Sequence, residues 1–314
     1  MYKIGIDYGG SHIAVALTYE EGDILAKSSI DVNTLDWNSM AGEKLTEMTV
    51  SLIKYCINES RINPASIDFV GIGIPGTPDV TKIQFLANMG IRNFDIGKEL
   101  QNRFDEIGLE KDNIKISLAN DADCAAVGEF VRGALRGSKY AINIVFGTGV
   151  GAGIIINREL YNGAHGSSGE IGHMTIDKNS NIQCGCGRRG CLETLCSVKR
   201  LRENISSKLG LDKVIEGTEL KELLESGESS EISDLWATYK ENLVLCLINM
   251  VNIFDPEKIS IGGSLSYLIE SDLADINKKV NEGCFNKEAN YKIVKAKLEN
   301  DAGLIGAAML GYNI

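Results

Sequence analysis

The segment CGCGRRGC contains Cys184, Cys186 and Cys191, and His173 precedes it in the chain. Thiolates and imidazoles are ligands that zinc prefers, and one histidine with three cysteines forms a closed, tetrahedral structural site. The glycines between the cysteines allow a short loop to bring three sulfur atoms around one point. Scattered core thiols or a disulfide are the alternatives, but the spacing favours zinc. Because such a set leaves no open position for an activated water, we expect the metal to be structural.

Two carboxylates flank this cysteine loop in the sequence. Glu170 stands shortly before His173 in GEIGH, and Glu193 shortly follows Cys191. A metal held by His173 would also orient its neighbours, so both carboxylates are suited to accept hydrogen bonds from the hydroxyl groups of a polar ligand. The glycine turns at 9–11 and 147–151 lie outside the loop, so we expect nucleotide contacts to survive the loss of a zinc ligand if the fold does.

The pair Asn120 and Asp121 follows the apolar run IKISLA and precedes an alanine-rich segment that should be helical. Phosphoryl transfer to an alcohol needs an aligned hydroxyl, a carboxylate that accepts its proton, and neutralised phosphate charge. Asp121, at the end of the predicted strand, is our candidate for this base, and Asn120 could hydrogen-bond a second hydroxyl. The alternative is that Asn120, Asp121 or Asp123 serves only as a helix N-cap.

Glycine turns offer sites for phosphate groups. In DYGGS, Asp7 ends an apolar run before the turn at 9–11, and FGTGVGAG contains a similar turn at 147–149. The backbone N–H groups of such turns can approach an anion closely. Either turn alone could be an ordinary hairpin, but the pattern occurs twice. The turn after KISIGG could lie against adenine or ribose, whereas His12 and His165 are expected to be ordinary side chains.

Two other phosphate-binding motifs are excluded. The sequence contains no G-x-x-x-x-G-K-[ST], and the G-x-G-x-x-G match at 71–76 has a proline inside it and no helix directly after it. Neither a P-loop nor a Rossmann site is therefore expected. Phosphate recognition must come from the hairpin turns.

The elements that position these groups can be predicted from hydrophobic periodicity. Apolar runs from Lys3, Ile13 and Asp23 predict an antiparallel meander. The strand, glycine turn and strand that open the chain recur near 140–157, which indicates two related α/β halves facing a shared ligand cleft. Further strands are predicted from 69 and 258, and helices at 40–60, 95–107, behind Asp121, over most of 193–253 and at the C-terminus.

Composition limits the class of protein. The chain has 314 residues, of which 44% are hydrophobic, which is enough for two domains with their own cores. A net charge of −11 disfavours nucleic-acid binding, and no apolar run approaches the roughly 18 residues of a membrane span. The 8 cysteines are too few for a disulfide scaffold and favour a reducing compartment. We expect a cytoplasmic enzyme that binds neither nucleic acid nor membrane.

With these motifs in place, the chain resembles the ROK family of sugar kinases and regulators over essentially its whole length. DYGGS, GIPG, NDAD, FGTGVGAG, GEIGH, CGCGRRGCLE and IGGS occur in the family's order, and the combination of GEIGH with the cysteine motif is highly specific. The resemblance implies an α/β, actin-like, hexokinase-type (ribonuclease H-like) fold with two domains, a central ATP and sugar cleft, and usually a homodimer. We expect a small domain at 1–118, a large domain with the zinc motif at 119–302, and a C-terminal helix at 303–314 that packs back on the small domain.

The resemblance also implies residue roles at the matching positions. Asp121 becomes the base, Asp7 helps to hold Mg²⁺ near the phosphates, and Gly263 lies near the adenosine. Ser11 stands where the family usually has threonine, and Asp123 where it has asparagine. The implied sugar ligands are Asn88, Asn120, Glu170, His173 and Glu193, with His173 also a zinc ligand, and the implied phosphate contacts are Gly9, Gly10, Ser11, Thr148 and Gly149.

The implied function is ATP-dependent phosphorylation of a hexose of the glucose or allose type, with ATP, Mg²⁺ and a structural Zn²⁺. A sugar-responsive regulator is an alternative, and it would carry a helix-turn-helix domain before the first strand. Because only two residues precede Lys3, we expect that domain to be missing. A non-catalytic sugar-binding protein is the third class, and the presence of Asp121 disfavours it.

Overall fold

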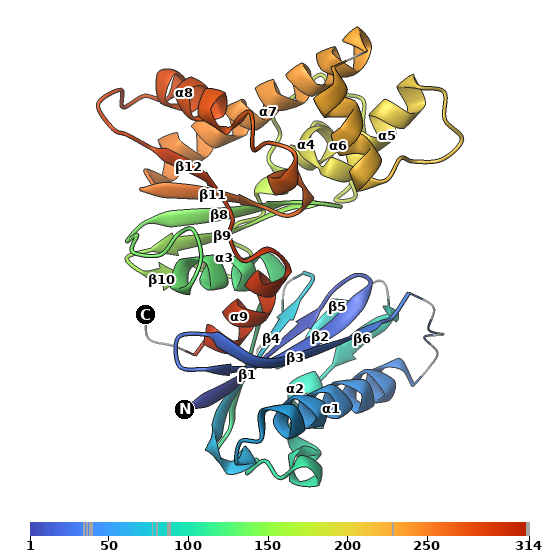
Figure 1. Ribbon diagram of the computed structural model, residues 1–314, viewed down its shortest axis with the longest axis vertical. Coiled ribbons are helices and arrows are strands. Elements are labelled where there is room, and N and C mark those ends of the chain that lie inside the picture. Colours follow the sequence, from blue (N-terminus) through green and yellow to red (C-terminus); the bar gives the residue numbers. More distant parts are fainter. Residues whose placement is uncertain are drawn as a thin grey trace. The chain divides into compact units, whose positions relative to one another are not determined.

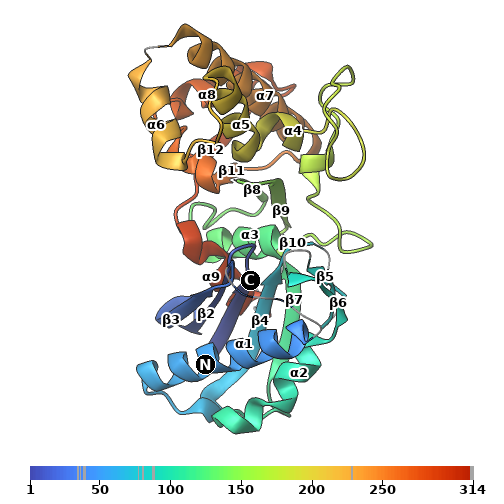
Figure 2. The same ribbon diagram turned by 90° about the vertical axis from the view of Figure 1, so that its right-hand side faces the viewer.

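The computed structural model describes residues 1–33, 35, 37, 40–76, 78–79, 81–86, 89–227 and 229–311 (Figures 1 and 2). The chain divides into two compact units. The first comprises Met1–Arg136, Glu159–Ser168 and Asn300–Ile314, and the second comprises Gly137–Arg158 and Gly169–Glu299. The limits expected from the sequence, 1–118 and 119–302, stay a prediction about domains.

The first unit is built on a sheet with the strand order β3-β2-β1-β4-β7. The first three strands form the predicted antiparallel meander, and the last two pair in parallel on the other side of β1. Because β1, β4 and β7 are parallel, their carboxyl ends lie at one edge of the sheet. The bounds are β1 (Tyr2–Tyr8), β2 (His12–Tyr19), β3 (Asp23–Asp31), β4 (Ile67–Ile74) and β7 (Lys115–Asn120).

Helices cover both faces of this sheet, as Figure 1 shows, with α1 (Ala41–Ser60) on one side and α3 (Asp121–Val131) and α9 (Ala302–Met309) on the other. The alternation of β2 explains the arrangement. Ile13, Val15 and Leu17 belong to the core that contains Leu45 of α1, whereas Ala14 and Ala16 pack with Leu304 of α9.

The remaining elements of the first unit are short. A hairpin of β5 (Ile83–Leu86) and β6 (Ile91–Phe94) was not predicted from the sequence. The helix expected at 95–107 is divided into α2 (Ile96–Asn102) and a 3₁₀ turn, η3 (Phe104–Ile107), and another 3₁₀ turn, η1 (Pro64–Ser66), precedes β4.

Glycines permit the close approach of α9 to the sheet. A Cβ atom at Gly71 of β4 would lie 1.7 Å from the backbone oxygen of Ala307. Because a backbone atom cannot move aside cheaply, we expect Gly71→Ala to lower the free energy of unfolding by about 3 kcal/mol, the upper end of typical overpacking costs. Gly217→Ala is the matched control, because a Cβ there would meet nothing within 4 Å. Denaturant unfolding of both variants tests this, and equal stabilities would contradict the proposed packing.

The second unit repeats the strand plan of the first. Its strands run in the order β9-β8-β11-β12, with β8 and β9 antiparallel and β8, β11 and β12 parallel, which matches β2-β1-β4-β7. The matching order confirms the predicted duplication. The bounds are β8 (Ala141–Phe146), β9 (Val150–Ile156), β11 (Lys258–Gly262) and β12 (Lys292–Lys295), whereas the two-residue strand β10 (Glu159–Leu160) lies in a segment of the first unit.

Helices of the second unit gather on one side of its sheet (Figure 2). Ile144 and Phe146 of β8 share a core with Leu243 and Leu247 of α7. Among the described residues, no helix is both long and apolar enough to cross a membrane. The bounds are α4 (Glu193–Cys196), α5 (Val198–Lys208), α6 (Gly217–Ser226), α7 (Ser230–Phe254) and α8 (Leu273–Gly283), with 3₁₀ turns η4 (Ile171–His173), η5 (Ser264–Tyr267) and η6 (Glu299–Asp301).

Candidate functional site

Carboxylates gather at the carboxyl edge of the first sheet. Asp7 lies at the end of β1, and Asp121 begins α3 directly after β7. Asp121 is exposed, whereas Asp123 is buried. Burial raises the pKa of the Cys124 thiol well above its usual range, and the negative charges of Asp7, Asp123 and Asp121 raise it further. The edge therefore carries concentrated negative charge, with Asp121 accessible to solvent.

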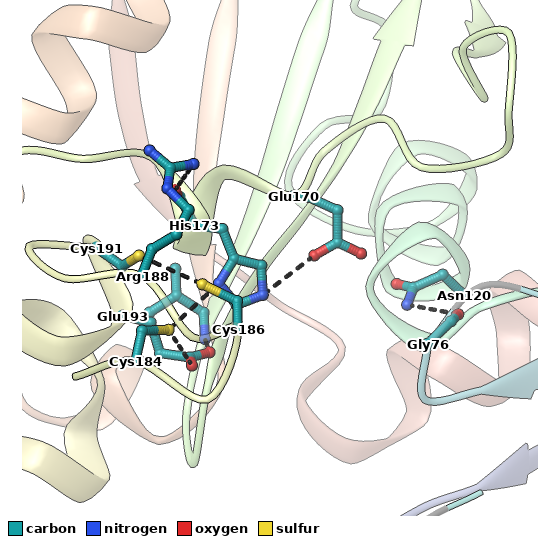
Figure 3. A network of polar contacts seen from close by, with 10 residues as sticks. Gly76, Asn120, Glu170, His173, Cys184, Cys186, Arg188, Cys191 and Glu193 are labelled. Atoms are coloured by element: carbon teal, nitrogen blue, oxygen red, sulfur yellow. Dashed lines mark hydrogen bonds and ion pairs between the residues drawn. The ribbon is translucent and has the colours of Figure 1, made fainter. Parts of the chain in front are cut away.

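Asn120 caps α3, as the alternative interpretation predicted. Its Oδ1 accepts a hydrogen bond from the Ala122 N–H at 2.8 Å. Its Nδ2 donates to the Gly76 carbonyl at 3.1 Å, as Figure 3 shows. The Asp121 Oδ1 also accepts from the Ala122 N–H, at 2.8 Å. These bonds fix the amide of Asn120 and hold the neighbouring carboxylate at the start of the helix. Capping and ligand binding are compatible here, because an amide has further hydrogen-bonding capacity.

The first glycine turn has a histidine against it. The Gly9 N–H donates to the His12 carbonyl at 2.9 Å, and His12 Nε2 lies 3.6 Å from Asp7 Oδ2. The neighbouring Asp7 carboxylate raises the pKa of His12, and the charge of Asp31 acts in the same direction against partial burial. We expected His12 to be an ordinary side chain, which stays a prediction, and the structure places it beside Asp7, the candidate Mg²⁺ ligand. Its position directly after DYGGS was the available signal.

The second glycine turn lies at the matching edge of the second sheet. The Gly147 N–H donates to the Gly149 carbonyl at 2.9 Å, and the Gly147 carbonyl accepts from the Lys199 N–H at 3.2 Å. Within the described part of the chain, the N–H groups of Thr148 and Gly149 donate to no protein acceptor. A Cβ at Gly263, where φ is +70°, would lie 2.4 Å from the Phe146 carbonyl oxygen, so the turns after β8 and β11 are in contact.

The cysteine loop and His173 bring their ligand atoms together. The three sulfur atoms and a ring nitrogen all lie within 4.8 Å of one another. His173 Nδ1 is 3.5 Å from Cys184 Sγ, and Cys186 Sγ is 3.7 Å from Cys191 Sγ (Figure 3). Tetrahedral geometry with Zn–S bonds of about 2.3 Å places neighbouring sulfur atoms about 3.8 Å apart. The set fits a zinc ion, and the thiols are free rather than paired as disulfides.

The chain folds tightly around this cluster. The Cys184 N–H donates to the Arg188 carbonyl at 2.8 Å, and Thr175 and Cys191 form a β-bridge. Arg188 Nη2 donates to Thr175 Oγ1 at 2.7 Å, and its Nη1 donates to the His173 carbonyl at 3.5 Å. Sequence reasoning missed this role of Arg188, although the residue lies inside CGCGRRGC. The guanidinium ties the segment that carries His173 to the cysteine loop.

The flanking carboxylates point to different partners. His173 Nε2 lies 3.8 Å from Glu170 Oε2, so one ring nitrogen faces the thiols and the other faces Glu170. Glu193 Oε2 instead accepts a hydrogen bond from the Val150 N–H at 3.1 Å, and its Oε1 lies 3.7 Å from Cys184 Sγ. Glu193 therefore joins the 147–151 turn to the metal loop, although the two are separate in the sequence.

Each unit thus holds its own part of the predicted site. The first contains Asp7, the 9–11 turn, Asn120 and Asp121, and the second contains the thiol and imidazole cluster, its two carboxylates and the 147–149 turn. Asn88, a predicted sugar ligand, lies outside the described residues.

Comparisons with known proteins agree with this arrangement. The family model described as ROK family matches residues 3–313. A glucokinase from Halalkalibacterium halodurans is 30% identical over 98% of this chain and 94% of its own length, and a xylose repressor from Bacillus spizizenii is 30% identical over 98% of this chain and 76% of its own. A ROK family glucokinase from Streptomyces griseus, solved with glucose and AMPPNP, superposes with a TM-score of 0.77 at 26% identity, covering 99% of each chain. The predicted actin-like, mixed α/β fold of sugar kinases is confirmed, and the chain belongs to the ROK family.

Proposed function

We propose that this protein is an ATP-dependent hexose kinase that transfers the γ-phosphoryl group to a sugar hydroxyl. The observation that carries the proposal is the exposed Asp121 carboxylate, which begins α3 at the same sheet edge as Asp7 and its glycine turn. The similarity to a glucokinase, and to a structure solved with glucose and AMPPNP, supports it.

The acceptor hydroxyl is activated by Asp121 in this proposal. A carboxylate within hydrogen-bond reach of the hydroxyl accepts its proton as the bond to phosphorus forms. Asn120, whose amide is already fixed by Ala122 and Gly76, holds a second hydroxyl. In the second unit, Glu170, His173 and Glu193 bind further hydroxyls of the sugar. Asn88 keeps its proposed role as a sugar ligand.

Phosphates are bound by the two glycine turns. The N–H groups of Thr148 and Gly149 are directed to no protein acceptor among the described residues and suit phosphate oxygens. Gly9, Gly10 and Ser11 form the corresponding turn of the first unit, and the backbone at Gly263 suits the adenosine.

Asp7 is the residue that would hold Mg²⁺. Carboxylate oxygen is the ligand this ion prefers, and the Asp7 carboxylate has small neighbours, since Cβ atoms at Gly73 and Gly303 would lie 3.7 and 3.4 Å from its oxygens. When bound, the ion neutralises charge on the transferring phosphates.

Zinc would be held by His173, Cys184, Cys186 and Cys191, whose spacing fits a tetrahedral site. It has a structural role in this proposal, fixing the loop from which Glu170, His173 and Glu193 reach the sugar. We also propose that the protein acts in the cytoplasm, where its free thiols would stay reduced, and that it forms a homodimer.

A sugar-responsive regulator is the second candidate, because a xylose repressor matches 98% of this chain as well as the glucokinase does. Such a protein would bind sugar without turnover. The net charge of −11 weighs against nucleic-acid binding by this chain.

A hexose panel tests the proposed function. We expect ADP release that depends on the sugar for at least one of glucose, allose, mannose, fructose, N-acetylglucosamine and N-acetylmannosamine, measured in a coupled assay with Mg-ATP. Sugar-free protein is the control for background hydrolysis. If calorimetry shows that a sugar binds but no sugar in the panel stimulates the release of ADP from ATP, the result would contradict the kinase proposal and favour the regulator.

A further inference from the structure

One side chain connects the cysteine loop with the phosphate turn of the second unit. Glu193 begins α4 just after Cys191, and its Oε2 accepts a hydrogen bond from the Val150 N–H at 3.1 Å. Val150 is the first residue of β9 and directly follows the turn at 147–149. All of these residues belong to the same compact unit.

The packing of Gly149 shows how close this connection is. A Cβ atom at Gly149 would lie 2.7 Å from Glu193 Oε2, which is too close for an ordinary contact. A Cβ atom at Gly147, in the same turn, would meet nothing within 4 Å. The carboxylate therefore lies directly against one side of the turn, and glycine at 149 leaves the space that it occupies.

The backbone that carries Glu193 is held by the cysteine loop. The Leu192 N–H donates to the Met174 carbonyl at 2.8 Å, and Thr194 Oγ1 donates to the Cys191 carbonyl at 2.7 Å. Met174 itself follows His173 in the chain. The carboxylate is thus supported from the segment that carries the metal-ligand set, while its oxygen bonds to the start of β9.

We infer that Glu193 is a positioning residue for the phosphate turn, in addition to its role as a sugar ligand under the proposed function on which this inference rests. By holding the Val150 N–H, it fixes the peptide groups of 148–149 that aim at the nucleotide phosphates. One carboxylate of the second unit would then contact the sugar directly and position the turn that binds the nucleotide phosphates. Preorganised donors bind an anion better than mobile ones, because their conformational entropy is already lost in the folded protein and is not lost on binding.

A series of variants at Glu193 separates its two roles. Glu193→Ala removes the acceptor, and we expect the affinity for Mg-AMPPNP in sugar-free protein to fall about tenfold, the scale of one lost hydrogen bond to a charged group. Glu193→Gln keeps an oxygen that can accept from Val150, so its AMPPNP affinity should stay within about threefold of wild type. Both variants should bind glucose more weakly.

Glu170→Ala is the matched control for that series. Glu170 is an exposed carboxylate near His173, and Glu193, not Glu170, makes the contact with the turn. Its removal should weaken glucose binding and leave AMPPNP affinity unchanged. A thermal melt and zinc content establish that each variant is folded.

The reciprocal test changes the glycine turn and measures the affinity for glucose. Gly149→Ala should displace the Glu193 carboxylate, and we expect glucose affinity in nucleotide-free protein to fall about threefold or more, because a displaced carboxylate loses part of a hydrogen bond to the sugar. Gly147→Ala adds the same methyl group where there is space, so glucose affinity should not change. This pair does not depend on whether Glu193 variants fold.

The results of these experiments separate the positioning role of Glu193 from the proposed kinase function. Unchanged AMPPNP affinity in Glu193→Ala, equal losses in Glu193→Ala and Glu193→Gln, or unchanged glucose affinity in Gly149→Ala would overturn the positioning role alone. Wild-type protein that binds neither glucose nor AMPPNP in calorimetry would overturn the proposed function and the positioning role together.

Discussion

Asp121→Asn is expected to lower kcat by about 10²–10⁴-fold, the usual contribution of a general base, while sugar and nucleotide affinities stay within about threefold of wild type. The amide keeps the shape of the side chain and can still accept from the Ala122 N–H, as Asp121 Oδ1 does at 2.8 Å. It cannot take the proton of the hydroxyl. The loss should therefore fall on the chemical step, which single-turnover kinetics with a saturating sugar will report.

Asp123→Asn is the matched control for this prediction. Asp123 is a carboxylate in the same first turn of α3, but it is buried whereas Asp121 is exposed. The substitution should leave kcat within a few-fold of wild type. A kcat for Asp121→Asn that is equally close to wild type would remove Asp121 from the role of base. Equal losses of kcat in both variants would indicate that the two carboxylates act through the total negative charge at this edge of the sheet.

Cys191→Ala is expected to abolish zinc binding, to lower the thermal midpoint by on the order of 10 °C and to weaken sugar binding. Structural zinc sites contribute several kcal/mol or more to folding, and each kcal/mol shifts the midpoint of a protein of this size by about 2–4 °C. Cys191 is one of the four possible ligands, and its Sγ lies 3.7 Å from Cys186 Sγ. The substitution by alanine therefore leaves three ligands. Because Glu193 also contacts Val150, nucleotide affinity should fall as well.

Cys246→Ala is the comparison for that loss. Cys246 is also a buried free thiol, but it belongs to the hydrophobic core of α7 and not to the ligand set. Elemental analysis of protein purified without added zinc should give about one zinc per chain in wild type and in Cys246→Ala, and almost none in Cys191→Ala. Absence of zinc from the wild-type protein would contradict the proposed metal site.

Periodicity predicted the elements that repeat or alternate strongly. The meander of β1 to β3 and the strand-turn-strand of β8 and β9 could be placed because each run is long and ends at a glycine or acidic turn. The short β12, KIVK, was missed, since four residues with little alternation carry no signal. The helix expected at 95–107 breaks at Arg103, where the backbone tightens into a 3₁₀ turn that no sequence pattern marks.

The ligand sets were predictable to the extent that they are local in sequence. The spacing of Cys184, Cys186 and Cys191 with His173 predicted a cluster that the structure assembles. The bond from Val150 to Glu193 joins residues far apart in the chain, and only the tertiary fold of the second unit brings them together. Sequence reasoning therefore separated a phosphate turn and a metal loop that the structure connects.

Transfer of label from [γ-³²P]ATP to the sugar is the most direct test of the proposed kinase activity. Wild-type protein, Mg²⁺ and the hexose panel should yield a labelled sugar phosphate for at least one sugar, and Asp121→Asn should yield it at least about a hundredfold more slowly. Wild-type protein that binds both ligands but transfers no label to any hexose, or an Asp121→Asn variant that labels the sugar at the wild-type rate, would contradict the claim that this carboxylate drives sugar phosphorylation.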